Sequence, residues 1–124
     1  MNLLLDSYAF LELLSPSPKA DRIKELVSSA DRVFTTVLNL YEVKYRVTQR
    51  ASVSVAESYL SSIRTSTHVL DVEEKTALSA SELKLKYPKL GAVDCITLAA
   101  AKEHGVVLVT GDPDFPTDEK IILL

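Results

Sequence analysis

Four acidic residues, far apart in the sequence, have the side-chain type needed to bind a divalent metal ion together: Asp6, Glu42, Asp94 and Asp112. Carboxylate oxygens are hard ligands, and Mg²⁺ and Mn²⁺ prefer such ligands. Buried carboxylates that lie close together raise one another's pKa unless a cation neutralises them. If the fold brings these side chains together, the sequence predicts a magnesium or manganese site. We do not expect zinc, because His68 and His104 lie outside this set.

The predicted strands and helices would carry these acids to one edge of a sheet. Asp6 directly follows the first apolar run of the chain, and Asp112 comes shortly after the apolar run 106–109. In parallel sheets, ligands bind beyond the carboxyl ends of the strands, near a change in strand order. Asp94 lies at the start of a predicted helix, and Glu42 lies on the helix after the second strand. All four acids could therefore meet at that edge.

Each acid also has a purely structural explanation. Asp6 can cap the helix that follows it, Asp94 can complement a helix N-terminus, and Asp112 can shape a turn beside Pro113. Glu42 can extend from the rim of its helix into water. Asp94 is the hardest to explain in this way, because small or apolar side chains share its face of the helix.

Small polar and acidic residues flank the first and last of these acids. Ser7 follows Asp6, and Thr110 precedes Asp112 by two positions. Either hydroxyl could orient a ligand or a bound water, or could only cap and turn the chain. Asp114 could supply a further outer oxygen, although the Asp-Pro-Asp sequence favours a structural turn.

Alternating strand and helix patterns predict the fold class. Apolar and β-branched runs predict strands at 2–5, 32–36, 68–72, 106–109 and 121–124. Apolar residues at helical spacing predict helices between them, of which one starts at Ser17-Pro18 and another ends at Gly105. The alternation predicts an α/β sandwich with a parallel sheet of about five strands and right-handed crossovers.

Size and composition favour one globular domain. The chain has 124 residues, of which 47% are hydrophobic and 25% are charged, and these values suit a single packed core. Cys95 is the only cysteine, which excludes an internal disulfide, and its apolar surroundings predict a buried side chain. No apolar run has the length of a signal peptide or a membrane span, so we expect a cytoplasmic protein.

The overall charge limits how the chain could bind a polyanion. A net charge of −3 and a pI near 5.4 provide no global positive field. Nucleic-acid binding would then depend on bound cations or on a local basic patch. Two groups of basic residues are candidates for phosphate contacts, or are simply solvated helix faces: Lys44, Arg46 and Arg50 after Glu42, and Lys84, Lys86 and Lys89 before Asp94.

The sequence resembles the PIN-domain ribonucleases, and among them the small VapC-type toxins of toxin–antitoxin pairs. The resemblance covers nearly all of the chain. It rests on chain length, on Glu42 in the helix after the second strand, and on the segments LLLDSYAFLELL (3–14) and VDCITLAAAKEHGVVLVTGDPDF (93–115). By position, the family's acidic quartet matches Asp6, Glu42, Asp94 and Asp112, and its polar surroundings match Ser7, Thr110 and Asp114.

The resemblance implies a three-layer α/β/α fold in which residues 1–124 form a single PIN-like domain. It also implies metal-dependent cleavage of RNA, a frequent homodimer and inhibition by a partner antitoxin. With Mg²⁺ or Mn²⁺ bound, water would attack the phosphate in line, with no covalent enzyme intermediate. Asp6, Asp94 and Asp112 would be metal ligands, and Glu42 would bind through water or accept a proton.

Other functions have a similar pattern of strands and helices. A catalytically silent PIN-like module that binds RNA or protein would share the fold, and a DNA or structure-specific nuclease would share the site. A haloacid-dehalogenase-like phosphatase is excluded because Tyr8 stands where it needs a second aspartate, and a receiver domain because no acidic pair accompanies Asp6. A homodimer could form through the helix 55–63, whose apolar stripe could equally belong to the core.

Overall fold

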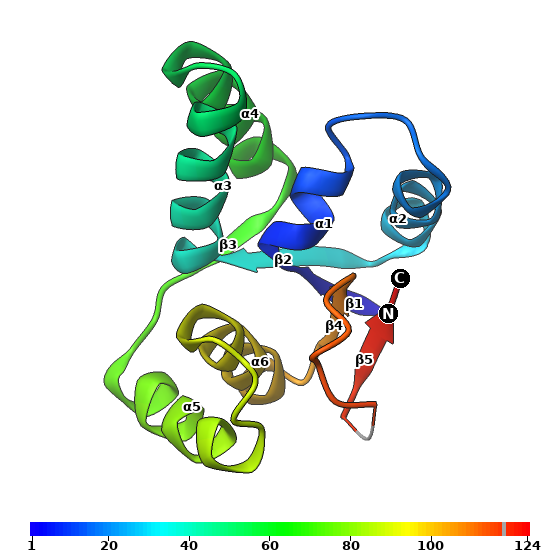
Figure 1. Cartoon of the computed structure of the whole chain (residues 1–124). Coiled ribbons are helices and arrows are strands. Elements are labelled where there is room, and N and C mark those ends of the chain that lie inside the picture. Colours follow the sequence, from blue (N-terminus) through cyan, green and yellow to red (C-terminus); the bar gives the residue numbers. More distant parts are fainter. Residues whose placement is uncertain (118) are drawn as a thin grey trace.

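Short apolar runs form the strands of a parallel sheet. The computed structural model describes residues 1–117 and 119–124, and Figure 1 shows how they are arranged. The strand order is β3-β2-β1-β4-β5, and all pairs are parallel. This confirms the predicted parallel α/β sheet. The strands are β1 (Asn2–Leu5), β2 (Arg32–Thr36), β3 (His68–Leu70), β4 (Val107–Thr110) and β5 (Ile121–Leu123).

The predicted helices lie between these strands. They are α1 (Ser7–Glu12), α2 (Pro18–Ser29), α3 (Val37–Arg50), α4 (Val53–Ser66), α5 (Glu74–Lys86) and α6 (Ala92–His104). Within residues 1–117 and 119–124, no helix is both long and apolar enough to cross a membrane.

Local capping explains where several helices begin and end. Side-chain oxygens accept backbone N–H groups at the starts of α1, α2, α3 and α4, from Asp6, Ser17, Thr36 and Ser52 respectively. Helix α6 ends at Gly105, whose φ of 63° is a left-handed conformation that glycine adopts without strain. Both predicted boundaries, at Ser17-Pro18 and at Gly105, are confirmed.

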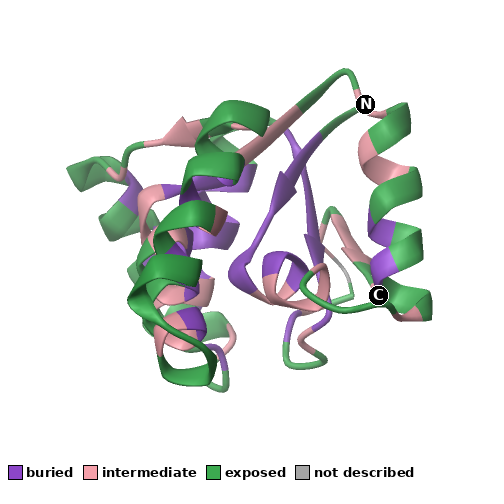
Figure 2. Cartoon of the chain, turned by 90° about the horizontal axis from the view of Figure 1, so that it is seen from above, coloured by how far each residue is buried: buried purple, intermediate pink, exposed green. Residues whose placement is uncertain are grey.

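Alternating side chains of the central strand β1 divide the molecule into three layers. Leu3 and Leu5 pack into one core with α1, α2, α3 and α4, whereas Leu4 packs into a second core with α5 and α6. Figure 1 shows the two helical layers on opposite sides of the sheet, and Figure 2 shows that the central strands are buried. The three-layer α/β/α fold is therefore confirmed.

The strand order places a binding crevice at β1. This strand pairs with β2 on one side and with β4 on the other, so the order of connection reverses there. Leu5 lies opposite Val109, and the backbone N–H of Asp6 donates to the Val109 carbonyl at 3.4 Å. Asp6 and the residues after Thr110 therefore leave the sheet side by side, at the point where ligands bind in open parallel sheets.

The exposure of two helices differs from the sequence pattern. By helical spacing, Tyr41 and Tyr45 fall on the same broad arc of α3 as the buried Val43 and Val47, yet 61% and 36% of their surface is exposed. Their rings lie against each other, with centroids 5.4 Å apart. On α4, Ala56, Leu60 and Ile63 belong to the core, so the stripe that could have formed a homodimer interface is used within the chain.

Candidate active site

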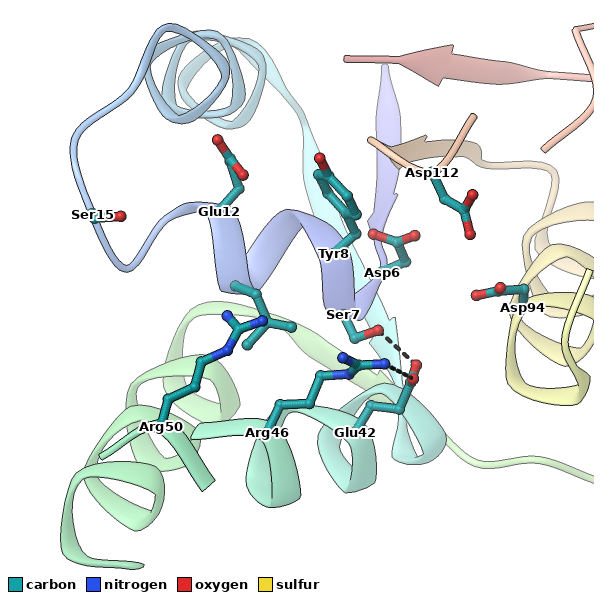
Figure 3. Close-up of a pocket in the computed structure, with 11 residues that line it drawn as sticks. Asp6, Ser7, Tyr8, Glu12, Ser15, Glu42, Arg46, Arg50, Asp94 and Asp112 are labelled. Carbon is teal, nitrogen blue, oxygen red and sulfur yellow. Dashed lines mark hydrogen bonds and ion pairs between the residues drawn. The ribbon is translucent and has the colours of Figure 1, made fainter. Parts of the chain in front are cut away.

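A cavity of about 460 Å³ lies at the carboxyl ends of β1 and β4. Figure 3 shows its lining. The four acids singled out by the sequence all reach it, from the end of β1, from α3, from α6 and from the loop after β4. The lining residues are Asp6, Ser7, Tyr8, Leu11, Glu12, Ser15, Glu42, Arg46, Arg50, Asp94 and Asp112.

Asp6 both caps a helix and lines the cavity. Its Oδ1 accepts the backbone N–H of Ala9 at 2.9 Å, and only 2% of its surface is exposed. Its pKa is raised from 3.8 to about 7, mainly by burial and to a smaller extent by the negative charges of Asp94 and Glu42. Hydrogen bonds from the Thr110 hydroxyl and from Ala9 lower the pKa and partly offset this effect. The capping role and the proposed site role are therefore compatible.

Asp94 lies in the first turn of α6 without capping it. The N-cap residue is Gly91, which has no side chain to offer. The pKa of Asp94 is raised to about 6, mainly by burial and also by the negative charges of Asp112 and Glu42. In the part of the chain that the structure describes, no lysine or arginine forms an ion pair with Asp6, Asp94 or Asp112. No basic side chain in the described chain therefore neutralises these three acids directly.

Glu42 is held in place by residues on two helices. The hydroxyl of Ser7 donates to Glu42 Oε1 at 2.6 Å. Nη2 of Arg46, one turn further along α3, lies 3.9 Å from Oε2. The hydrogen bond from Ser7, whose side chain is buried, fixes the carboxylate at the rim of the cavity. Ser7 therefore orients the Glu42 carboxylate, a contact between distant segments that the sequence did not predict.

The loop after β4 presents Asp112 and turns Asp114 away. Thr110 Oγ1 accepts the backbone N–H of Asp112 at 3.1 Å, and Asp112 Oδ1 accepts the backbone N–H of Asp114 at 2.9 Å. Asp112 lines the cavity, whereas Asp114 is exposed and does not. In Figure 3 the Asp112 carboxylate lies toward Asp94. Of the two acids in this turn, Asp112 is the one placed to act at the cavity.

A close contact between Tyr8 and Gly111 shapes one wall of the cavity. A Cβ atom at Gly111 would lie 2.0 Å from a ring carbon of Tyr8, so a side chain at this position would collide with the ring. Neither Tyr8 nor Gly111 was predicted from the sequence to belong to the site. The Gly-Asp pair directly after a strand is the signal that could have indicated Gly111.

A buried polar network behind the cavity was also missed. Asn39, 1% exposed, accepts a hydrogen bond from Thr36 Oγ1 at 2.9 Å and donates to Thr97 Oγ1 at 3.3 Å. Thr35 Oγ1 donates to the Leu5 carbonyl at 2.9 Å. These bonds connect the end of β1, the start of α3 and the first turns of α6, which are the elements that carry the acids. Asn39 and Thr97 are polar residues on otherwise apolar helix faces, and this feature of the sequence could have indicated that they are buried and paired.

The basic residues separate into two groups. Arg46 and Arg50 line the cavity, whereas Lys44 does not. Lys84 donates to the carbonyls of Pro88 and Leu90, and Lys86 lies 3.7 Å from Glu119. Lys84 and Lys86 therefore stabilise the end of α5 and its surroundings, and Lys89 is not among the residues that line the cavity.

The donor set fits a hydrated divalent ion. The oxygens of Asp6, Asp94 and Asp112 are hard ligands with no basic partner among the described residues, while His68 and His104 both lie against the Phe34 ring. Among the described residues, no three acidic, histidine or cysteine side chains are arranged to hold one ion directly. Mg²⁺ needs fewer protein ligands, because it keeps several waters and binds through one or two carboxylates and substrate phosphates. The full set of direct ligands stays a prediction.

Comparisons with known proteins agree with this architecture. The PIN-domain family model matches residues 3–118, and no curated protein sequence matches the chain significantly. A toxin–antitoxin complex from Klebsiella pneumoniae is 20% identical, with a TM-score of 0.77 over 97% of this chain and 95% of that chain. VapBC2 from Rickettsia felis, in a crystal structure with a promoter DNA fragment, is 18% identical, with a TM-score of 0.77 over 100% of this chain and 98% of that chain.

A third similar structure is VapC20 from Mycobacterium tuberculosis, described as a toxin that cleaves the sarcin-ricin loop. It is 19% identical, with a TM-score of 0.74 over 94% of this chain and 91% of that chain. At such identities these structures show a shared fold. The family match spans most of the sequence and agrees with the three-layer structure and with the resemblance read from the sequence, so this chain belongs to the PIN-domain family.

Proposed function

We propose that this protein is a metal-dependent ribonuclease that hydrolyses phosphodiester bonds in RNA, with Mg²⁺ or Mn²⁺ as its cofactor. The observation that carries the proposal is the meeting of four carboxylates from four parts of the chain at one cavity. Two of them, Asp6 and Asp94, have a raised pKa, and neither forms an ion pair with a basic residue in the described chain. Such a cluster favours the binding of cations.

The proposed chemistry divides the work among these side chains. A bound Mg²⁺ or Mn²⁺ would supply a water of lowered pKa and would neutralise negative charge on the phosphate. Asp6, Asp94 and Asp112 would be its ligands, one or two of them directly and the rest through waters bound to the ion. Glu42, oriented by its bond from Ser7, would hold it through water or accept a proton from the attacking water. Thr110 would orient Asp6 through its hydroxyl, and Asp114 would act only by supporting the turn at Asp112.

The choice of RNA and the biological role rest on the family and its relatives. VapC20 is described as a toxin that cleaves the sarcin-ricin loop, and the similar structure from Klebsiella pneumoniae is a toxin–antitoxin complex. We infer that this chain is the toxin of such a pair, acts in the cytoplasm, forms a homodimer and is inhibited by a partner antitoxin. Co-purification with the product of a neighbouring reading frame, followed by a measurement of mass in solution, tests the partner and the dimer.

Cleavage assays on RNA and DNA test the proposed activity. Labelled single-stranded RNA and the matching single-stranded DNA are incubated with the protein in EDTA, in Mg²⁺ and in Mn²⁺. The proposal expects cleavage of RNA only when a metal is present. Preferential cleavage of DNA would instead identify a DNA nuclease. No cleavage, together with no metal binding by calorimetry, would identify a silent PIN-like module.

A further inference from the structure

The helix α3 carries a row of charged side chains along the cavity. Glu42, Arg46 and Arg50 are spaced by four residues, so they lie on one face of the helix. Each step advances about 6 Å along the helix axis. All three residues line the cavity, whereas Lys44, on the same helix, does not. The row therefore runs from the acidic cluster toward the other end of the cavity.

The two arginines make the cavity electrically polar. They are the basic residues among its described lining, and Figure 3 shows them to one side of Asp6, Asp94 and Asp112, with Arg46 beside Glu42 and Arg50 further along the helix. The acids can hold cations, but they repel any phosphate that is not bound to a cation. A phosphate next to the reacting one is therefore favoured only at the arginine end.

Both guanidinium groups are available to a ligand. Arg46 is 42% exposed, and its contact with Glu42 is a long one, at 3.9 Å. Arg50 is exposed and forms no ion pair within residues 1–117 and 119–124. A guanidinium group binds phosphate oxygens through two parallel hydrogen bonds, which a surface ammonium does not reproduce. Glu12 also lines the cavity; a hydrogen bond from Ser17 at 2.8 Å holds its carboxylate without neutralising it, so the two arginines face one negative charge on α1.

We propose that Arg46 and Arg50 bind successive backbone phosphates on one side of the scissile bond, so that α3 guides a single strand of RNA into the acidic cluster. This inference rests on the proposed ribonuclease function and adds to it the path of the substrate. Proteins that bind single strands without sequence preference use a positively charged groove that follows the backbone, and the two arginines line the cavity in this way. Arg46 and Arg50 would contact backbone phosphates and so position the strand, without selecting a base sequence.

Arg50→Ala is the cleanest test, because Arg50 does not contact Glu42. Lys44→Ala is the matched control, with the same change of charge on the same exposed helix but outside the cavity. Binding of a short labelled single-stranded RNA is measured against salt concentration, with Ca²⁺ in place of Mg²⁺ to keep the RNA intact. Arg50→Ala should weaken binding by about fivefold. It should also lower the salt slope, the steepness with which the logarithm of the binding constant falls with the logarithm of salt concentration, by about 0.7, which corresponds to the loss of one single-strand phosphate contact.

Removing both arginines should lower the salt slope by about 1.4, and Lys44→Ala should leave it unchanged. In cleavage assays with Mg²⁺, Arg50→Ala should raise KM by a similar factor and leave kcat within about twofold. Equal salt slopes for Arg50→Ala and Lys44→Ala would overturn the inference even if the protein cleaves RNA. Failure of the wild-type chain to cleave RNA would instead count against the proposed function, because the binding assay does not depend on cleavage.

Discussion

Neutralising Asp6 should change how stability depends on pH. Its carboxyl group is buried, and its pKa is raised from 3.8 to about 7. Between these values the folded chain holds a proton that the unfolded chain has lost, so stability falls as pH rises from about 4 to 7. From pH 5 to pH 8, this linkage amounts to roughly 2 to 3 kcal/mol, taking 1.36 kcal/mol for each pKa unit.

Asp6→Asn removes this linkage but keeps the helix cap, since asparagine is an equally good N-cap residue. Urea unfolding of both proteins in EDTA at pH 5 and pH 8 measures the effect. Wild type should lose roughly 2 to 3 kcal/mol relative to the variant over this range. With Mn²⁺ present, the cation should offset most of the loss in wild type, because it stabilises the ionised carboxylate.

Asp31→Asn is a control of opposite sign. The N-terminal ammonium lowers the pKa of Asp31, so its ionised form contributes stability that is lost as pH falls through the folded pKa. The stability of wild type relative to Asp31→Asn should therefore fall only as pH drops below 3.8, whereas the stability of wild type relative to Asp6→Asn should fall as pH rises from 5 to 8. If the stability difference between wild type and Asp6→Asn is the same at pH 5 and pH 8, the proposed state of the buried carboxyl group is wrong.

Two further substitutions test residues that the sequence did not single out. Thr97→Val removes the acceptor for the Asn39 amide and should cost about 1–3 kcal/mol in unfolding free energy. Thr97→Val should also weaken the affinity for Mn²⁺, measured by calorimetry. Thr76 is buried as well but donates to Glu103 instead, so Thr76→Val should lower stability and leave the Mn²⁺ affinity unchanged. Equal Mn²⁺ affinities for the two variants would show that Thr97 does not position the acids. Gly111→Ala should cost about 1–3 kcal/mol because its Cβ would meet the Tyr8 ring, and an unchanged thermal midpoint would show that the ring moves freely.

Much of the fold could be predicted because its signals are local. The apolar run before Asp6, the Ser17-Pro18 pair and Gly105 each act within a few residues, and each boundary forms as expected. The alternation of strands and helices then leaves few parallel topologies. The acids could be placed at one edge by the same reasoning, because residues that follow parallel strands leave the sheet on the same side.

Contacts between distant segments could not be predicted in this way. Asn39 and Thr97 are 58 positions apart, and nothing in the sequence around either residue indicates that the two form a hydrogen bond. The same holds for Tyr8 and Gly111. Lys44 and Arg46 look alike in the sequence, yet only Arg46 faces the cavity, because facing depends on how α3 packs. Such features follow from the packing of whole elements, which a single sequence does not specify residue by residue.

Cleavage by an Asp94→Asn variant tests the central claim most directly, with Asp114→Asn as its control. Both changes remove one negative charge near the same site, but Asp94 lines the cavity and Asp114 does not. Circular dichroism establishes that both variants fold. With Mg²⁺ or Mn²⁺, Asp94→Asn should cleave RNA about 100-fold more slowly or worse than wild type, and Asp114→Asn should remain within about threefold. Undiminished cleavage by Asp94→Asn, or cleavage by wild type in EDTA, would contradict the account.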